Sequence, residues 1–134
     1  MSKLFDLSAL STVELEPGLT KDVIKVGDGA TPTRGDEIYA HYTGKLKDGT
    51  VFDSSRSRGK PFCCKIGLGM VISAWDIAFL GMKVGERAVI SSDAAHGYGA
   101  AGAGGVIPPN AELFFDVELI SVGAPAEGGF CVVA

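Results

Sequence analysis

The sequence predicts an α+β domain in which five or six short antiparallel strands form one sheet and a single short helix covers one of its faces. Apolar and polar residues alternate with a period of two in several short segments, which is the pattern of half-buried strands. Only one segment carries the signals of a helix start. The chain of 134 residues also contains 19 glycines and six prolines, which favour frequent turns. We expect one domain with a modest core.

The strands are predicted from short alternating or apolar segments bounded by turn residues. The clearest turn is Asp48-Gly49, because both residue types tolerate positive φ in a two-residue hairpin. We expect an N-terminal extension over residues 1–18, a folded domain over 19–122 and a flexible tail over 123–134. The predicted strands cover residues 13–16 in the extension and 19–26, 38–46, 50–52, 62–66, 87–91 and 113–119 in the domain.

The helix is predicted to begin at Ser73, whose hydroxyl can cap the free amides. Asp76, as the third helical residue, can bond back in a capping-box arrangement. Gly81 should end it after about two turns. The polar residues 53–61 are expected to form a loop. Residues 93–112 form a longer loop rich in glycine, alanine and proline, and a loop of this length is either functional or mobile.

Composition excludes several classes of function. The net charge is −4 and no basic stripe is present, so nucleic-acid binding is not expected. No segment reaches the length of a transmembrane helix or resembles a secretion signal, so we expect a cytoplasmic protein. Cys63, Cys64 and Cys131 show no metal-ligand spacing, which predicts free thiols and neither a metal site nor a cofactor.

Two motifs in the long loop are misleading. Residues 97–102 match the glycine pattern of dinucleotide-binding proteins, but that function needs a helix opening at these glycines. The following Val106-Ile107-Pro108-Pro109 cannot form one. Asp93 and His96 lie near two serines without the turn motif of a serine hydrolase, so a surface loop is the expected explanation.

A series of short motifs in fixed order resembles the signature of the FK506-binding-protein (FKBP) family. It spans about residues 20–122, roughly three quarters of the chain, and becomes specific only as a set. The segments that carry it are His41-Tyr42-Thr43-Gly44, Asp48-Gly49, Phe52-Asp53-Ser54-Ser55, Arg58, Lys60-Pro61-Phe62, Val71-Ile72, Trp75, Gly85-Glu86-Arg87-Ala88, Tyr98-Gly99, Val106-Ile107-Pro108-Pro109-Asn110 and Leu113-Phe114-Phe115-Asp116-Val117-Glu118-Leu119.

The resemblance implies a strongly twisted half-barrel sheet wrapped around the helix, and peptidyl-prolyl cis-trans isomerase activity. The implied ligands are proline-containing polypeptides and the macrolides FK506 and rapamycin, together with the signalling proteins that such complexes recruit. We expect a monomer. A binding module that holds a partner in the same pocket, with turnover incidental, is the alternative.

The residues that the resemblance assigns to catalysis are Tyr42, Asp53, Ile72, Trp75, Tyr98 and Phe115. Those assigned to ligand binding add Phe52, Arg58, Phe62, Val71, Val106 and Ile107. In this scheme Trp75 forms the pocket floor, the loop from Ala94 to Pro109 overhangs it and the Ile72 amide receives a substrate carbonyl. Asp53 orients and polarises without transferring a proton. Periodicity alone would place Trp75 and Phe115 in the core, and Asp53 could simply cap the Ser54-Ser55 turn.

Four residues depart from what the family commonly carries, namely Cys64, Gly69, Ala74 and Ala103. We expect Cys64 and Ala103 to trim the pocket wall and rim, which would alter specificity and macrolide affinity. The final Cys131-Val132-Val133-Ala134 fits a prenylation motif, and modification of Cys131 would add membrane association. An accidental apolar terminus is the alternative.

Overall fold

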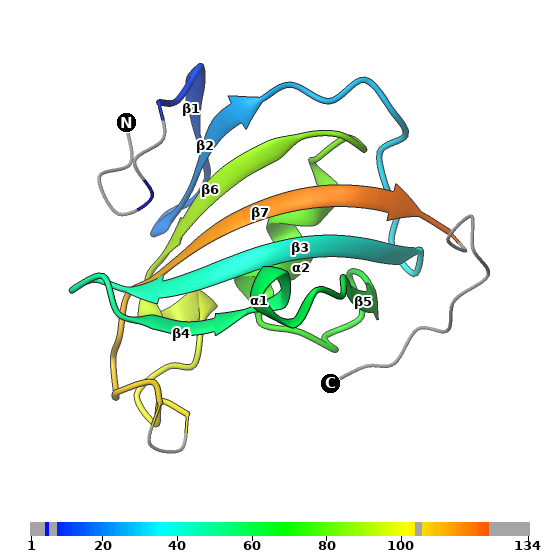
Figure 1. Ribbon diagram of the computed structural model, residues 1–134. Helices are drawn as coiled ribbons and strands as arrows, with labels where there is room; N and C mark the ends of the chain where they lie inside the picture. Colours follow the sequence, from blue (N-terminus) through cyan, green and yellow to red (C-terminus); the bar gives the residue numbers. More distant parts are fainter. Residues whose placement is uncertain (1–4, 6–7, 104–105, 124–134) are drawn as a thin grey trace.

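A computed structural model describes residue 5, residues 8–103 and residues 106–123 of the chain (Figure 1). These residues form one antiparallel sheet of seven strands with a helix of eight residues against it, which confirms the predicted α+β class. The elements are β1 (Ser11–Glu16), β2 (Leu19–Lys25), β3 (Glu37–Leu46), β4 (Val51–Ser54), α1 (Ser55–Arg58), β5 (Phe62–Lys65), α2 (Ser73–Leu80), β6 (Arg87–Ser92), the 3-10 turn η1 (Ala94–His96) and β7 (Leu113–Val122).

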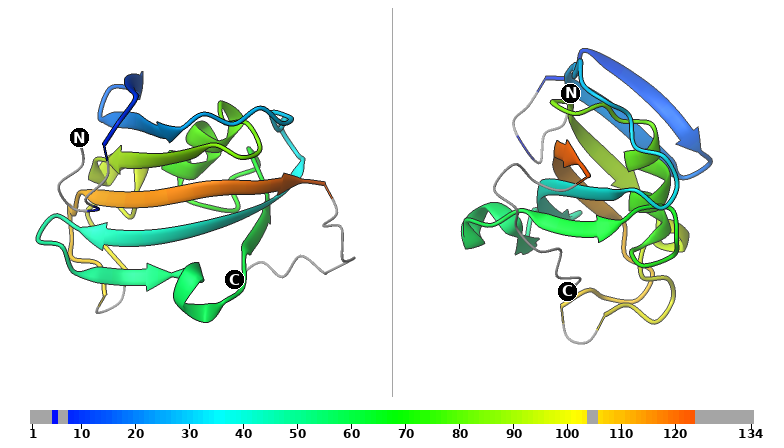
Figure 2. Two further views of the ribbon diagram at one scale, coloured as in Figure 1. Left: turned by 45° about the horizontal axis from the view of Figure 1, so that its top comes forward. Right: turned by 90° about the vertical axis from the view of Figure 1, so that its right-hand side faces the viewer.

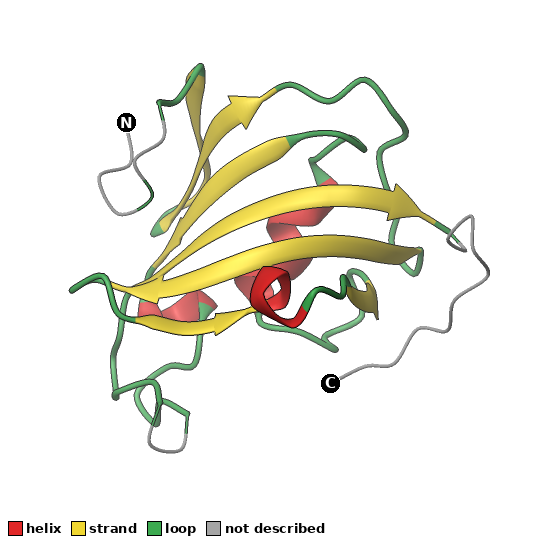
Figure 3. Cartoon of the chain, viewed as in Figure 1, coloured by secondary structure: helices red, strands yellow, loops and turns green. Residues whose placement is uncertain are grey.

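The sheet has the strand order β1-β2-β6-β7-β3-β4, and β5 also pairs with β3. The long strand β3 pairs with β7 on one side and with the two short strands β4 and β5 on the other. The helical turn α1 therefore lies at the edge of the sheet between β4 and β5 (Figure 3). Figure 2 shows α2 on one side of the curved sheet. The sheet has seven strands instead of five or six because β1, in the expected extension, pairs with β2.

The core lies between α2 and the sheet. Trp75, Ala78 and Phe79 on α2 are buried against Ile90 on β6 and Phe115 on β7. The alternation predicted for the last strand is confirmed, since the core contains the apolar residues Leu113, Phe115, Val117 and Leu119. Burial of these side chains on one face ties the helix to the sheet.

The start of α2 differs from the prediction. Ile72 is the N-cap residue and makes no side-chain cap. The Ser73 hydroxyl instead donates to the backbone oxygen of His96 at 3.3 Å. The Asp76 carboxylate accepts from the amides of Gly67 at 2.7 Å and Gly69 at 2.9 Å. Both side chains therefore bond to neighbouring loops, and the capping-box prediction is wrong. The predicted end of the helix at Gly81 is confirmed.

The predicted loop over residues 53–61 is also wrong in part, because Ser55–Arg58 form the helical turn α1. Ser54 is extended and its hydroxyl accepts from the Ser57 amide at 3.4 Å, while Gly59 ends the turn with φ of 68°. Serine before a helix and glycine after it are the usual end signals, but four residues are too few to show helical periodicity.

The prediction of free thiols is confirmed for one cysteine and wrong for another. Cys64 is a buried free thiol, as predicted, and burial with the nearby Asp76 charge raises its pKa to about 12. Cys63 is disulfide-bonded, so the expectation of free thiols is wrong for that residue. Cys131 lies outside the described residues. None of the helices in the described part of the chain has the length and apolar character needed to cross a membrane.

Candidate functional site

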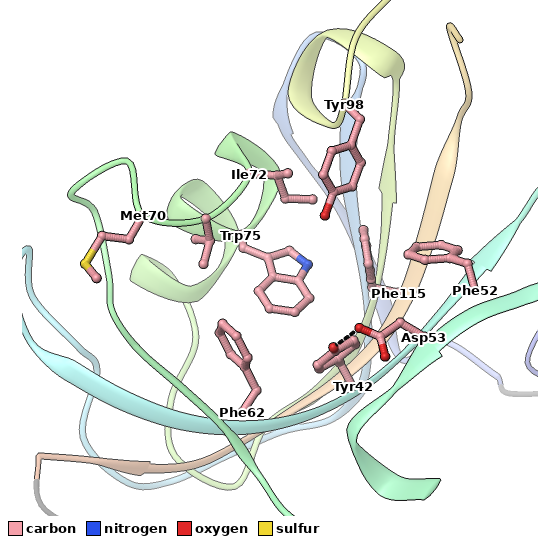
Figure 4. Close-up of a pocket in the computed structure, with 10 residues that line it drawn as sticks. Tyr42, Phe52, Asp53, Phe62, Met70, Ile72, Trp75, Tyr98 and Phe115 are labelled. Atoms are coloured by element: carbon pink, nitrogen blue, oxygen red, sulfur yellow. Dashed lines mark hydrogen bonds between the residues drawn. The ribbon is translucent and has the colours of Figure 1, made fainter. Parts of the chain in front are cut away.

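A pocket of about 180 Å³ opens between the beginning of α2 and the concave face of the sheet (Figure 4). Drug-sized ligands usually occupy sites of roughly 300–1,000 Å³, so this pocket suits one small ring. Its walls come from β3, β4, β5, β7, the loop before α2 and the loop after η1. The lining residues are Tyr42, Phe52, Asp53, Phe62, Met70, Val71, Ile72, Trp75, Tyr98 and Phe115.

Trp75 forms the floor of the pocket and is the centre of its aromatic wall. Its ring makes edge contacts with Tyr42, Phe62 and Phe115, with ring centroids 4.7, 5.1 and 5.3 Å apart. The side chain is 6% exposed, and the indole N–H has no hydrogen-bond partner among the described residues. A buried donor without a partner is costly. This donor is therefore available to a ligand in the pocket.

Asp53, Tyr42 and Arg58 form the polar corner of the pocket. The Tyr42 hydroxyl donates to the Asp53 carboxylate (Figure 4), and Arg58 donates to the same carboxylate at 2.5 Å and to the Tyr42 oxygen at 3.1 Å. Partial burial disfavours the Asp53 charge, but these bonds outweigh it and hold the pKa of Asp53 below its usual value. Burial, with the bond to Asp53, raises the pKa of Tyr42 to about 12. Near neutral pH the corner therefore holds a carboxylate and a protonated phenol.

The backbone of Tyr42 is held from behind by Ser55, which is fully buried. The Tyr42 amide donates to the Ser55 hydroxyl oxygen at 2.7 Å, and the same oxygen lies 2.9 Å from Nδ1 of His41. Burial, together with the charge of Arg56, lowers the pKa of His41. The helical turn α1 thus positions both Tyr42, through Ser55, and Arg58. Sequence reasoning missed Ser55 because its role depends on contact with another strand.

The loop before α2 supplies the opposite wall. The amides of its two glycines, Gly67 and Gly69, donate to the Asp76 carboxylate. This fixes the loop so that Met70, Val71 and Ile72 lie at the pocket. Within the described residues the Ile72 amide donates no hydrogen bond, whereas its carbonyl accepts from the amides of Trp75 and Asp76. A free amide at the beginning of a helix can receive a ligand oxygen.

The structure brings most of the predicted site residues together. All lining residues except Met70 were expected from the sequence. Met70 is 43% exposed at the rim, and no local pattern in the sequence assigns it to the pocket. Arg58 is not a lining residue, but it donates hydrogen bonds to two lining residues, Tyr42 and Asp53. Ile107 belongs to the core, and Val106 is 54% exposed and does not line the pocket.

The departures from the family pattern lie mostly outside the pocket wall. Cys64 and Ala74 are fully buried in the core, so Cys64 does not trim the wall as expected. Gly69 has φ of +75°, a conformation that glycine adopts without strain. Ala103 is half-buried and pairs with Ile107, also away from the lining.

Gly44 on β3 allows two aromatic rings of the wall to meet. A Cβ at this position would lie 2.6 Å from Cζ of Phe52 and 3.0 Å from Cε1 of Phe115. We expect Gly44→Ala to displace these rings and to lower the free energy of unfolding by about 1–3 kcal/mol. Because Phe115 contacts the only tryptophan, Trp75 fluorescence should change as well.

Chemical denaturation and emission spectra of the folded variant would measure both effects. Gly81→Ala is the matched control, because its Cβ would meet only the Ala78 oxygen at 3.8 Å. Equal spectra and equal stability for Gly44→Ala and the unmodified chain would contradict the assigned packing of Phe52 and Phe115.

Comparison with known proteins places these features in a family. A family model described as FKBP-type peptidyl-prolyl cis-trans isomerase matches residues 29–120. FK506-binding protein 1 of Dictyostelium discoideum is 52% identical over 104 residues, which cover 78% of this chain and 97% of that protein. FK506-binding protein 1 of Saccharomyces cerevisiae is 48% identical over 109 residues, covering 81% and 96%. A peptidyl-prolyl cis-trans isomerase of Schizosaccharomyces pombe is 47% identical over 106 residues, covering 78% and 95%. The chain belongs to the family of FKBP-type peptidyl-prolyl cis-trans isomerases.

Proposed function

We propose that the pocket over Trp75 is where this isomerase binds the proline ring of its substrate. The observation that carries the proposal is an apolar aromatic pocket with two donors that have no partner in the part of the chain that the structure describes, the Ile72 amide and the Trp75 indole N–H. The aromatic walls suit a prolyl ring, and the donors suit the carbonyl groups that flank it. A pocket of about 180 Å³ holds that ring, while neighbouring residues lie against the rim.

The chemistry required is rotation and not bond cleavage. Conjugation between nitrogen and carbonyl gives the peptide bond a barrier of about 18–20 kcal/mol, and rotation removes that conjugation. Water stabilises the planar ground state by hydrogen bonding to its charge-separated carbonyl. A dry aromatic pocket favours the twisted amide over the planar one, and each ~1.4 kcal/mol of such preference gives a tenfold rate increase.

Asp53 acts in this scheme through its charge and its hydrogen bonds. Its carboxylate is already bound by Tyr42 and Arg58, and its pKa lies below the usual value because those bonds outweigh partial burial. A group held ionised in this way is a poor proton donor near neutral pH. We therefore assign Asp53 to orientation of Tyr42 and of the bound amide.

The macrolides FK506 and rapamycin are proposed as further ligands of the same pocket. The relatives in Dictyostelium discoideum and Saccharomyces cerevisiae are named for binding FK506. Because the pocket holds only about 180 Å³, most of such a ligand would lie outside on the rim, against Met70 and Tyr98. A ligand exposed in this way could recruit signalling proteins to a monomeric complex.

The test is the isomerisation rate of short Leu-Pro and Phe-Pro peptides with and without rapamycin. We expect acceleration that the macrolide abolishes, because the peptide and the macrolide would occupy the same pocket over Trp75. If the folded protein binds rapamycin but does not accelerate isomerisation, the pocket serves as a binding module and not as an enzyme active site. Acceleration that persists at saturating rapamycin would show that this pocket is not the catalytic site.

We also propose a cytoplasmic location, with membrane association if Cys131 is prenylated. The C-terminal sequence motif alone supports prenylation, which requires Cys131 as a free thiol, whereas Cys63 is disulfide-bonded. One lipid chain anchors a protein only marginally. Mass spectrometry of the C-terminal peptide from native cells would detect a prenyl group, and a peptide of unmodified mass would contradict prenylation.

A further inference from the structure

His96 lies outside the pocket in a cluster of charged side chains that the isomerase mechanism does not use. Its Nδ1 lies 2.7 Å from Oδ1 of Asp93, and its Nε2 lies 3.2 Å from Oε1 of Glu16. The side chain is 15% exposed. Both ring nitrogens therefore face carboxylate oxygens, one just after β6 and the other at the end of β1.

The backbone around His96 connects the same cluster to the pocket. The His96 oxygen accepts from the Ser73 hydroxyl at the start of α2, and the Asp93 amide donates to the Gly18 oxygen at 2.8 Å in the β1–β2 turn. Two residues after His96 comes Tyr98, which lines the pocket and is 42% exposed. Figure 4 shows the Tyr98 ring above Trp75, with its hydroxyl pointing into the pocket.

The contact between this segment and the β1–β2 turn is tight. A Cβ on Gly18 would lie 2.0 Å from Oδ2 of Asp93, so the Asp93 carboxylate lies as close to the Gly18 backbone as glycine allows. The Asp93 carboxylate also accepts from the His96 amide at 3.0 Å. The carboxylate that faces the imidazole is therefore packed against the Gly18 backbone and is bonded to the His96 amide.

We propose that His96 is a positioning residue for the isomerase pocket: its imidazolium holds the segment that carries Tyr98 against the β1–β2 hairpin, and loss of its proton releases that wall. The proposal rests on the assignment of the pocket as the isomerase site. In this arrangement the β1–β2 hairpin contacts the active site through His96, which is not itself a ligand-binding residue.

The protonation state matters because of what faces each nitrogen. An imidazolium has two donors and can bond both carboxylates, whereas neutral imidazole has one donor and one acceptor. In the neutral form one nitrogen lone pair would face a carboxylate oxygen, which is repulsive. Among the described residues the charged groups that face the ring are Asp93 and Glu16, and the contact from α2 is the uncharged Ser73 hydroxyl on the His96 backbone oxygen.

Hydrogen bonds that the His96 ring donates to Asp93 and then to Glu16 raise the pKa of His96 above 6.5, although partial burial opposes this. The folded state therefore keeps the proton over a pH range in which the unfolded state has lost it. The contacts of the imidazolium with Asp93 and Glu16, here called the His96 clamp, are complete below the unfolded pKa of His96. They are lost as the pH rises through the folded pKa. The wall should thus be held at pH values below the folded pKa of His96 and released at pH values above it.

The experiment compares kcat/KM for a blocked Leu-Pro peptide without titratable groups across the range from about pH 5.5 to about pH 9, with an NMR titration of the His96 ring. We expect kcat/KM to fall about two- to tenfold as His96 loses its proton. His41 is the only other histidine, and its pKa is lowered mainly by burial, so the two transitions separate.

Glu16→Gln should move both the NMR and the kinetic transition to lower pH, because it removes one of the two carboxylates. His96→Gln should abolish the kinetic transition and leave kcat/KM near the alkaline value. Glu14→Gln is the matched control, since Glu14 is exposed on the same strand and has no contact with His96. Its profile should match that of the unmodified chain.

Two results would overturn the proposal. The first is a His96 pKa at or below its ordinary value. The second is a raised pKa with a kinetic profile that does not follow it, which would make the clamp purely structural. If the unmodified protein fails to accelerate isomerisation at any pH, the proposed function fails, while the NMR shifts of Tyr98 during the His96 titration still test the clamp.

Discussion

Replacement of Trp75 by leucine is expected to lower kcat/KM for a Leu-Pro peptide on the order of tenfold or more, because about 1.4 kcal/mol of lost preference for the twisted amide gives that factor. Trp75 contacts Tyr42, Phe62 and Phe115, so its loss loosens three walls at once. It also removes the buried indole donor, which has no partner within residues 8–103 and 106–123. Steady-state kinetics on protein shown to be folded by circular dichroism would measure the effect.

Trp75→Phe separates the two contributions of this residue. Phenylalanine keeps an aromatic floor and deletes the N–H group, so a variant close to the unmodified chain would assign the effect to the apolar surface. A large loss in both variants would assign it to the donor. Folded Trp75→Leu with unchanged kcat/KM would contradict the placement of the substrate ring over Trp75.

The second large effect is on stability, at the buried ion pair between β2 and the turn before β6. Lys21 Nζ lies 3.0 Å from Glu86 Oε2, and both side chains are buried. Glu86 Oε1 accepts from the Lys83 amide at 3.3 Å, and among the described residues Lys21 is the only cation that pairs with this carboxylate. Lys21 also reaches the Gly81 oxygen at the end of α2 at 3.4 Å. We expect Lys21→Met to lower the free energy of unfolding by about 3–5 kcal/mol.

A double variant tests whether this loss comes from the uncompensated carboxylate. Lys21→Met with Glu86→Leu should recover most of the stability, because no buried charge remains. Lys47→Met is the control: Lys47 pairs with Glu112 at 3.4 Å on an exposed surface, where about 0–1 kcal/mol is expected. Urea unfolding of the four proteins gives the comparison. A loss below about 1 kcal/mol for Lys21→Met would contradict a buried pair.

The predicted and observed elements agree best where a signal is local. The alternation in residues 113–119 and the hairpin at Asp48-Gly49 both depend on neighbours in the chain, and both elements were confirmed. The turn itself differs from the predicted two-residue form, because β3 ends at Leu46, β4 begins at Val51 and only Gly49 of the two turn residues has a positive φ. Ser73 and Asp76 also have the spacing of a local capping signal, but stronger partners lie in the loops at His96, Gly67 and Gly69. A local pattern is overridden when a tertiary partner competes for the same side chain.

The pocket was largely predicted because the family resemblance supplies a set of positions and not a single motif. Periodicity alone would have placed Trp75 and Phe115 in the core, and both are in fact buried there while also lining the pocket. Val106 and Ile107 were expected to line it as well and do not, because Ile107 turns into the core and Val106 into solvent. Neighbouring residues in a loop have no fixed periodicity that separates these directions.

The sequence by itself determined the fold class, the order of the elements and most of the aromatic wall, since these follow from alternation, turn residues and ordered motifs. Only the tertiary structure decided that Met70 joins the pocket, that Lys21 and Glu86 pair and that His96 meets Glu16. The physical reason is that each of these contacts joins segments far apart in the chain, where burial and charge depend on how the sheet curves around α2 and not on neighbouring residues.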